Sequence, residues 1–228
     1  MISRFPWTFC EAEKNTKVGV VKTGGTPPSR PWPFPSSQPW VWFEKIIRWL
    51  NIIALQNTFH YKSSYWENKV PYNTYGGATH KDQFQETKLP TYWTLPLKRL
   101  CLGMMTGGHL NWIRLDYKAS SLYSLIADGR YRATSLGRNT WKSLIRGSSL
   151  QRNCNREGFN VYHVGQMARI GIIANQQNHC KSPDSRIAFG GGGSYCRTRN
   201  SNSCGNEAQC SADGGKRHTV AFGYIFAQ

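Results

Sequence analysis

The sequence predicts an α+β domain with short strands, short helices and long disulfide-stapled loops. Hydrophobic residues make up 39% of the 228 residues and aromatic residues 13%, which is enough apolar surface to bury a core. Turn-forming residues interrupt the apolar pattern every few positions, so long helices are not expected. Six of the seven cysteines lie between residues 101 and 210, where Gly, Asn and Ser are frequent. Such a cysteine set is typical of disulfide-stapled domains.

The chain divides into three parts. Residues 1–40 are an irregular lead rich in proline and glycine. Residues 41–57 form an apolar, Trp-rich segment that stands where the main domain would begin, and its apolar residues recur at three and four positions. That spacing predicts a helix over 40–56. Residues 58–228 form the domain itself. No stretch of eighteen uninterrupted apolar residues occurs, so we expect no membrane span.

Local signals place the elements of the main domain. Ser120 and Ser121 can cap a short helix that runs to Asp128 and stops at Gly129, and Asn139 can cap a second one that ends at Gly147. Strands are expected at four segments: 159–162, 168–174, 185–189 and 218–226. Four glycines follow the third of these, at 190–193. No Lys-Ser/Thr pair comes after them, so we interpret them as backbone that lies close to a neighbour rather than as a phosphate loop.

The later cysteines predict a disulfide framework and an oxidising compartment. The framework residues are Cys101, Cys154, Cys180, Cys196, Cys204 and Cys210. A zinc site built from three of them and His218 is the alternative, but the CxxC pairs of zinc ribbons are absent. Cys10 is left over and is either free or available to link two chains into an oligomer. The cysteines therefore predict a secreted, extracellular protein, although residues 1–40 contain no apolar run of signal-peptide length.

The charge of the chain predicts an anionic partner. There are 29 Lys and Arg against 12 Asp and Glu, a net charge of +17. Glycans and acidic matrix macromolecules fit such a charge in the extracellular space. Nucleic acid would fit it too, but the disulfides place the protein outside the cell, so we do not expect that partner. The basic residues are scattered along the later part of the chain and form no basic arm.

The sequence contains no recognisable catalytic motif. A nucleophile elbow and an HExxH zinc helix are both missing, and the six histidines are dispersed. We therefore expect a non-enzymatic protein. Calcium is the one cofactor with candidate ligands, because Asp184, Asn206 and Asp213 offer side-chain oxygens within the cysteine-rich loops. They lack the density of a dedicated calcium loop.

Ordered blocks of residues resemble the fibrinogen-like domains of coral skeletal organic matrix proteins. The resemblance covers about residues 58–228, roughly three quarters of the chain. The blocks lie at residues 86–93, 101–104, 119–123, 137–141, 153–160, 168–172, 182–190, 204–208 and 223–225. A more distant likeness to intelectins rests on the glycine run and on Cys204 and Gly205. The two histidines that intelectins place before these glycines are absent here, where Ser185, Arg186 and Ile187 stand, so we assign no sugar-binding residue.

This resemblance implies a fibrinogen C-terminal-like fold and a lectin-like role. We therefore expect a non-enzymatic extracellular binding or matrix protein that recognises glycans or acidic matrix components. Two alternatives stay open at this point. One is a calcium-dependent lectin of innate-immune type, and the other is a structural protein of a skeletal organic matrix.

Overall fold

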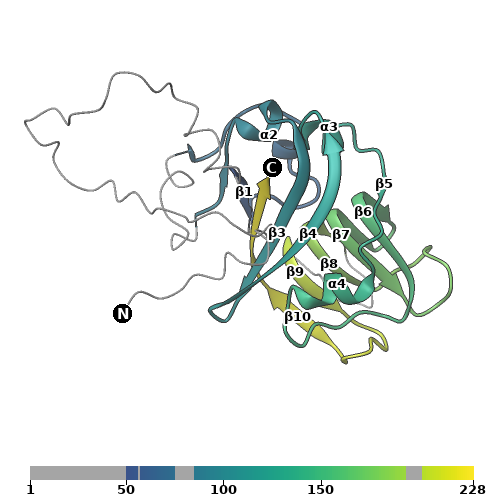
Figure 1. Cartoon of the computed structure of the whole chain (residues 1–228). Helices are drawn as coiled ribbons and strands as arrows, with labels where there is room; N and C mark the ends of the chain where they lie inside the picture. The colour runs from purple at the N-terminus through teal and green to yellow at the C-terminus, as the bar shows by residue number, and fades with distance from the viewer. Residues whose placement is uncertain (1–49, 56, 75–84, 194–201) are drawn as a thin grey trace, which may run out of the picture.

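The protein folds as two antiparallel β-sheets that face each other around a shared core, as the computed structural model in Figure 1 shows. The structure describes residues 50–55, 57–74, 85–193 and 202–228. Two packed antiparallel sheets define a β-sandwich-like architecture. The predicted fold class, an α+β domain of the fibrinogen C-terminal-like type, is wrong. The molecule is built mostly from antiparallel strands, and its helices are short.

The first sheet has five strands in the order β2-β1-β11-β3-β4. Its strands are β1 (Leu50–Leu55), β2 (Thr87–Lys88), β3 (Leu97–Thr106), β4 (His109–Ala119) and β11 (Phe222–Ala227). β3 and β4 form a long hairpin around Gly107 and Gly108, which both have positive φ angles (53° and 78°). The predicted elements did not include this hairpin, although a Gly-Gly pair between apolar runs is a hairpin signal.

The second sheet has six strands in the order β10-β9-β8-β7-β6-β5. Its strands are β5 (Arg132–Ala133), β6 (Asn153–His163), β7 (Gln166–Asn175), β8 (Ser185–Gly192), β9 (Cys204–Ala208) and β10 (Arg217–Val220). The strands predicted at 159–162, 168–174 and 185–189 are confirmed as parts of β6, β7 and β8. The one predicted at 218–226 is two strands, because the chain passes from β10 in this sheet to β11 in the other.

The described helices are short. They are the 3-10 helix η1 (Ser64–Trp66) and the α-helices α2 (Thr91–Thr94), α3 (Leu122–Ile126) and α4 (Arg138–Ser143). α3 confirms the predicted short helix and its cap, since Ser121 forms a capping box, but the helix ends at Ile126 instead of Asp128. Gly129 follows with a φ of 69°. α4 begins earlier than predicted. Its N-cap is Gly137 instead of Asn139, because the Gly137 N–H is held by the buried Glu157 carboxylate.

The expected helix over 40–56 is wrong where the structure describes it. Residues 50–55 form β1, which lies between β2 and β11 in the five-stranded sheet. Apolar and polar residues do not alternate regularly in the segment LNIIAL. It nevertheless forms a strand, because strands on both sides pair with its backbone, and this pairing overrides the helical spacing of its residues. The sheet thus includes residues that precede Thr58, the expected start of the domain. Residues 1–49 lie outside the described ranges, and with them the predicted irregular lead.

The main core lies between the two sheets. Leu100, Leu102 and Ile113 reach it from the five-stranded sheet, and Ile172 and Ile187 from the six-stranded sheet. Buried aromatic residues close the core, including Phe59, Trp66, Tyr92 and Trp141, each of them 0% exposed. Among the described residues, no helix is long and apolar enough to cross a membrane.

The glycine run at 190–193 is confirmed as a close backbone contact. A Cβ atom at Gly190 would lie 2.6 Å from the Trp66 ring, and one at Gly193 would lie 2.1 Å from the carbonyl oxygen of Gly165. Gly193 also has a φ of 105°, which side-chain-bearing residues rarely adopt. These glycines therefore let β8 pack against the aromatic core.

Candidate anion-binding site

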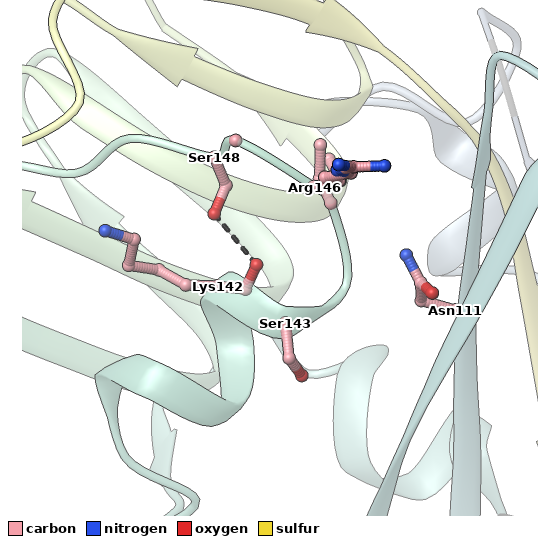
Figure 2. Close-up of a pocket in the computed structure, with 7 residues that line it drawn as sticks. Asn111, Lys142, Ser143, Arg146 and Ser148 are labelled. Atoms are coloured by element: carbon pink, nitrogen blue, oxygen red, sulfur yellow. Dashed lines mark hydrogen bonds between the residues drawn. The ribbon is translucent and has the colours of Figure 1, made fainter.

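A cavity of about 510 Å³ lies between the end of α4 and strand β4 (Figure 2). Asn111 of β4 lines one side of it. The other lining residues come from α4 and the turn that follows: Lys142, Ser143, Ile145, Arg146, Gly147 and Ser148. The cavity is open to solvent. It is the candidate functional site of this protein, and we call it the α4 pocket.

Buried contacts fix the position of the α4 pocket. Trp141 is fully buried and its indole N–H donates to the Glu157 Oε2 at 2.7 Å, which anchors α4 to β6. Leu144 and Ile145 are also buried in the core. Gly147 then turns the chain with a φ of 72°, a conformation that favours glycine at the end of a helix. The pocket wall is therefore held by the fold.

The polar groups of the wall donate their hydrogens inward to the backbone. Ser148 Oγ donates to the Lys142 carbonyl at 2.8 Å, as Figure 2 shows, and Ser143 Oγ donates to the Thr140 carbonyl at 2.7 Å. Asn111 Nδ2 donates to the Leu144 carbonyl at 3.2 Å, which ties β4 to the end of α4. The side-chain oxygens of these three residues then remain as acceptors for a ligand.

Asp213 holds two cations beside the α4 pocket. Its Oδ2 lies 2.8 Å from Arg138 Nη2 and 2.6 Å from Lys142 Nζ, and its Oδ1 accepts from the Leu150 N–H at 3.1 Å. Burial pushes the pKa of Asp213 up, but the hydrogen bonds from Lys142, Arg138 and the Leu150 N–H outweigh it and hold that pKa below its ordinary value. Asp213 is thus ionised at neutral pH and locks the loop after β9 onto α4.

Two arginines at the pocket keep their charge available. Arg146 is exposed and forms no hydrogen bond or ion pair with another part of the described chain. Arg217 of β10 donates from Nε to the carbonyl of Gly147 at 3.0 Å, and its guanidinium is exposed. Figure 2 shows Arg146 and Asn111 on the same side of the turn, whereas the ammonium end of Lys142 points away from them. Lys216 adds a further exposed cation next to Arg217.

The three predicted calcium ligands have different surroundings. Asp213 is engaged by two cations. Asn206 is fully buried, accepts from the Ser149 N–H at 2.8 Å and donates to the carbonyls of Ser149 and Arg186. Both side chains are therefore used by the fold. Within the described ranges, no three His, Cys, Asp or Glu side chains gather to hold a metal ion. The prediction of a calcium site gains no support at Asn206 or Asp213.

Asp184 is the third predicted ligand, and it is 3% exposed. Its Oδ2 accepts from Gln151 Nε2 at 3.0 Å, while its Oδ1 has no hydrogen-bond partner. The Gln151 amide also faces the carbonyl oxygen of Cys210 at 2.6 Å and the Oε1 of Gln176. Burial raises the pKa of Asp184, and the hydrogen bond from Gln151 only partly opposes this. This carboxyl group is a candidate for protonation inside the fold.

The disulfide framework is confirmed in part and wrong at one residue. Cys154 and Cys180 form a disulfide that closes the loop after β7 onto β6. Cys101 and Cys210 are also disulfide-bonded. Cys204 was expected to belong to the framework, but it is a free, buried thiol on β9. It faces the core, where burial raises its thiol pKa, and Cys10 and Cys196 lie outside the described residues.

Arg186 is a structural residue. It is 1% exposed, and its guanidinium donates to the carbonyl of Asn202 at 2.7 Å and to the Oε1 of Gln166. Burial lowers the pKa of Arg186 to about 10, and the neighbouring Glu207 opposes that shift. Glu207 in turn contacts His218 Nδ1 at 2.5 Å. These three side chains lie across β8, β9 and β10.

Comparison with known proteins does not assign a family to this chain. No family model matches it, and neither the curated proteins nor the solved structures contain a match. These comparisons therefore do not identify a fibrinogen-like domain. The site must be interpreted from its own chemistry.

Sequence reasoning missed the α4 pocket. Arg146 and Arg217 are visible in the sequence as two of many scattered cations, separated by about seventy residues. Asn111 lies on a strand that was not predicted. Only Asp213 was singled out, and its predicted function was different. The one signal that could have helped is the segment 138–152, which contains four basic residues and no acidic residue.

Proposed function

We propose that the protein is a non-enzymatic extracellular binding protein that captures anionic matrix macromolecules at the α4 pocket. The observation that carries this proposal is the charge around the pocket. Lys142 and Arg146 line the pocket, and Arg217 donates to the carbonyl of Gly147 in its wall. Asp213 pairs with Lys142 and Arg138 and leaves Arg146 and Arg217 without an acidic partner among the described residues. An excess of exposed cations at a cavity attracts polyanions.

Two further observations support an extracellular role and a binding role. The disulfide between Cys154 and Cys180 is typical of oxidising compartments. The polar side chains that line the α4 pocket are cations and oxygen acceptors, which suit the binding of a ligand by charge and hydrogen bonds. None of the pocket residues is a nucleophile next to a base, so binding is the function that this chemistry favours.

The proposal is tested by measuring retention on immobilised heparin, a sulfated glycan, as a function of salt. The variant R146E/R217E reverses two cations at the pocket. We expect it to lose roughly tenfold or more in affinity at physiological salt, because two cations that attract the polyanion become two anions that repel it. The binding should also depend less on salt.

The matched control is K98E/K118E, which makes the same change in net charge. Lys98 and Lys118 are exposed and lie at the end of the β3–β4 hairpin that is far from Asn111. Lys118 is seven residues from Asn111 along β4, a distance of roughly 23 Å. We expect this control to lose about twofold. Equal losses in the two variants, or no retention of the natural protein at physiological salt, would contradict the proposal. A chelator of divalent cations should leave retention unchanged.

A further inference from the structure

The α4 pocket combines a free cation with a set of oxygen acceptors, whereas an anion alone would need only the cation. This inference rests on the proposed function and concerns the chemistry of the ligand at that same site. The cation is Arg146, whose charge no other part of the described chain neutralises. The oxygen acceptors are on Asn111, Ser143 and Ser148. A ligand that fits both must be negatively charged and must also donate hydrogen bonds.

Arg146 is suited to the negative group. A guanidinium presents paired N–H donors that match the oxygens of a carboxylate or sulfate. Arg217 stands beside the pocket, because its Nε already donates to the Gly147 carbonyl and its Nη1 to the Lys216 carbonyl at 2.9 Å. Two guanidinium groups thus flank the same turn, while Lys142 is occupied by Asp213.

The acceptors determine which groups the ligand must carry besides its negative charge. The hydroxyl hydrogens of Ser143 and Ser148 are used on the Thr140 and Lys142 carbonyls, so these hydroxyls can only accept from a ligand. The Asn111 amide donates one of its two hydrogens to the Leu144 carbonyl, and its oxygen can accept from a ligand. Three acceptors that line the same cavity as one free cation call for a ligand that carries both a negative charge and hydroxyl donors.

We propose that the α4 pocket binds one acidic sugar residue of a glycan, with the sulfate or carboxylate on Arg146 and the neighbouring hydroxyls donating to Ser143, Ser148 and Asn111. The cavity of about 510 Å³ is in the size range of small-ligand pockets. A nucleic-acid strand fits less well, because no aromatic side chain lines the pocket for base stacking. An acidic peptide carries its N–H donors on the backbone, away from the carboxylate.

The test compares small probes on the full-length protein by calorimetric titration. The probes are N-acetylglucosamine 6-sulfate, glucuronic acid, inorganic sulfate and tri-aspartate. We expect at least one of the two acidic sugars to bind about fivefold or more tighter than inorganic sulfate, because its hydroxyls add hydrogen bonds that sulfate cannot make. The two sugars separate a sulfate-binding from a carboxylate-binding pocket.

Variants locate the hydrogen bonds. S143A and S148A should each reduce the advantage of the acidic sugar over inorganic sulfate by about threefold, and R146Q should weaken both probes. Ser120 is an exposed serine without a side-chain hydrogen bond to other described residues, so S120A is the matched control. Because the Ser148 hydroxyl also supports the end of α4, thermal unfolding is recorded for every variant. The exposed Ser143 keeps the test valid if S148A does not fold.

The outcomes separate the two proposals. If neither acidic sugar binds tighter than inorganic sulfate, or if both serine variants keep the full advantage, the inference about sugar is overturned. The proposed function still stands in that case, provided that heparin retention depends on Arg146 and Arg217. Tri-aspartate that binds as tightly as the sugars would make the ligand an acidic peptide and would also overturn the inference. Absence of heparin retention would overturn the proposed function itself.

Discussion

Two regions of this molecule place a cation close to oxygen atoms, but in one the fold uses the charge and in the other the charge stays available to a ligand. At Lys88 the ammonium group is fully buried and donates to the carbonyls of Tyr65 (2.6 Å) and Asn68 (2.7 Å) and to the Asn68 Oδ1 (2.8 Å). The rings of Tyr92, Trp93 and Tyr65 lie 4.9, 5.6 and 5.7 Å from it. At the α4 pocket, Arg146 is exposed and has no such partner among the described residues.

The difference shows that net charge alone says little about binding. Burial lowers the pKa of Lys88 to about 8, so the group is still largely protonated at neutral pH, and the three oxygens use all its hydrogens. Arg169 and Arg186 are likewise buried and engaged within the fold. A part of the net charge of +17 is therefore used to hold the structure together. The charge available to a ligand is the part that the fold leaves without partners.

The largest effect is expected from breaking the Lys88 region. K88M keeps an apolar stem but removes the donor that the carbonyls of Tyr65 and Asn68 share, while the Asn68 Oδ1 still accepts from the Val70 N–H. We expect a loss of about 3 kcal/mol in the free energy of unfolding. Urea denaturation measures it. The control is K69M, because Lys69 is exposed and lies 5.1 Å from the Tyr123 ring, without a buried oxygen cage. Comparable stability of K88M and K69M would show that the cage is not structural.

A second variant changes the positive charge that is available beside the α4 pocket. D213N removes the carboxylate that engages Arg138 and Lys142, so we expect a stability loss of roughly 1–2 kcal/mol, between the values for surface and buried ion pairs. The same variant should bind heparin more tightly, because both cations become available. Denaturation and salt elution are measured together. Weaker heparin binding in a folded D213N protein would argue against the pocket as the binding site.

The Asp213 contribution also has a defined pH dependence. Its folded-state pKa is held below the ordinary value, so its stabilising effect is present above that ordinary value and is lost as the pH falls through the folded pKa. The stability difference between the natural protein and D213N should therefore shrink in acid. A difference that stays constant to pH 2.5 would contradict this assignment.

Asp184 sharpens the comparison, because it is a buried carboxyl group that forms no ion pair with another described residue. Its folded-state pKa is raised, so its contribution to stability is fully present below the ordinary pKa and is lost as the pH rises through the folded value. D184N cannot ionise, and we expect it to gain stability relative to the natural protein as the pH rises from 4 to 7. The effect should be smaller than at Asp213 and opposite in sign. Parallel pH profiles for the two proteins would disprove it.

The smallest effect is expected at Cys204. Its thiol is 1% exposed and burial raises its pKa, so iodoacetamide should not modify it in the folded protein. Peptide mass analysis after labelling in urea should find Cys204 alkylated, and labelling without urea should leave it unmodified. Modification of Cys204 in the native state would show that β9 opens or that this cysteine takes part in disulfide exchange.

Local signals predicted several elements well. Ser121 was recognised as the cap of α3, and the apolar residues of β6, β7 and β8 were recognised as strands. The fold class failed for a definite reason. The β3–β4 hairpin was not recognised, and residues 50–55, whose spacing suggested a helix, pair with β2 and β11. Pairing partners that are far apart in the sequence overrode the local preference.

The candidate site was predicted even less. Asp213 was noticed for its carboxylate, but its charge partners Arg138 and Lys142 lie more than seventy residues earlier in the chain. Cys204 was grouped with the disulfide cysteines because spacing cannot distinguish a paired thiol from a buried one. The calcium ligands were proposed from residue type alone, and residue type does not show that Asn206 is already bonded to Ser149 and Arg186.

The sequence by itself determined that this protein is basic, rich in aromatic residues and cross-linked, and that its later half contains strands separated by tight turns. These properties depend on composition and on neighbours within a few residues. The tertiary structure alone decided which cations are used by the fold and which are left for a ligand. That outcome depends on contacts between β4, α4, the loop after β9 and β10, and the free energy of a charge is set by the atoms around it in space.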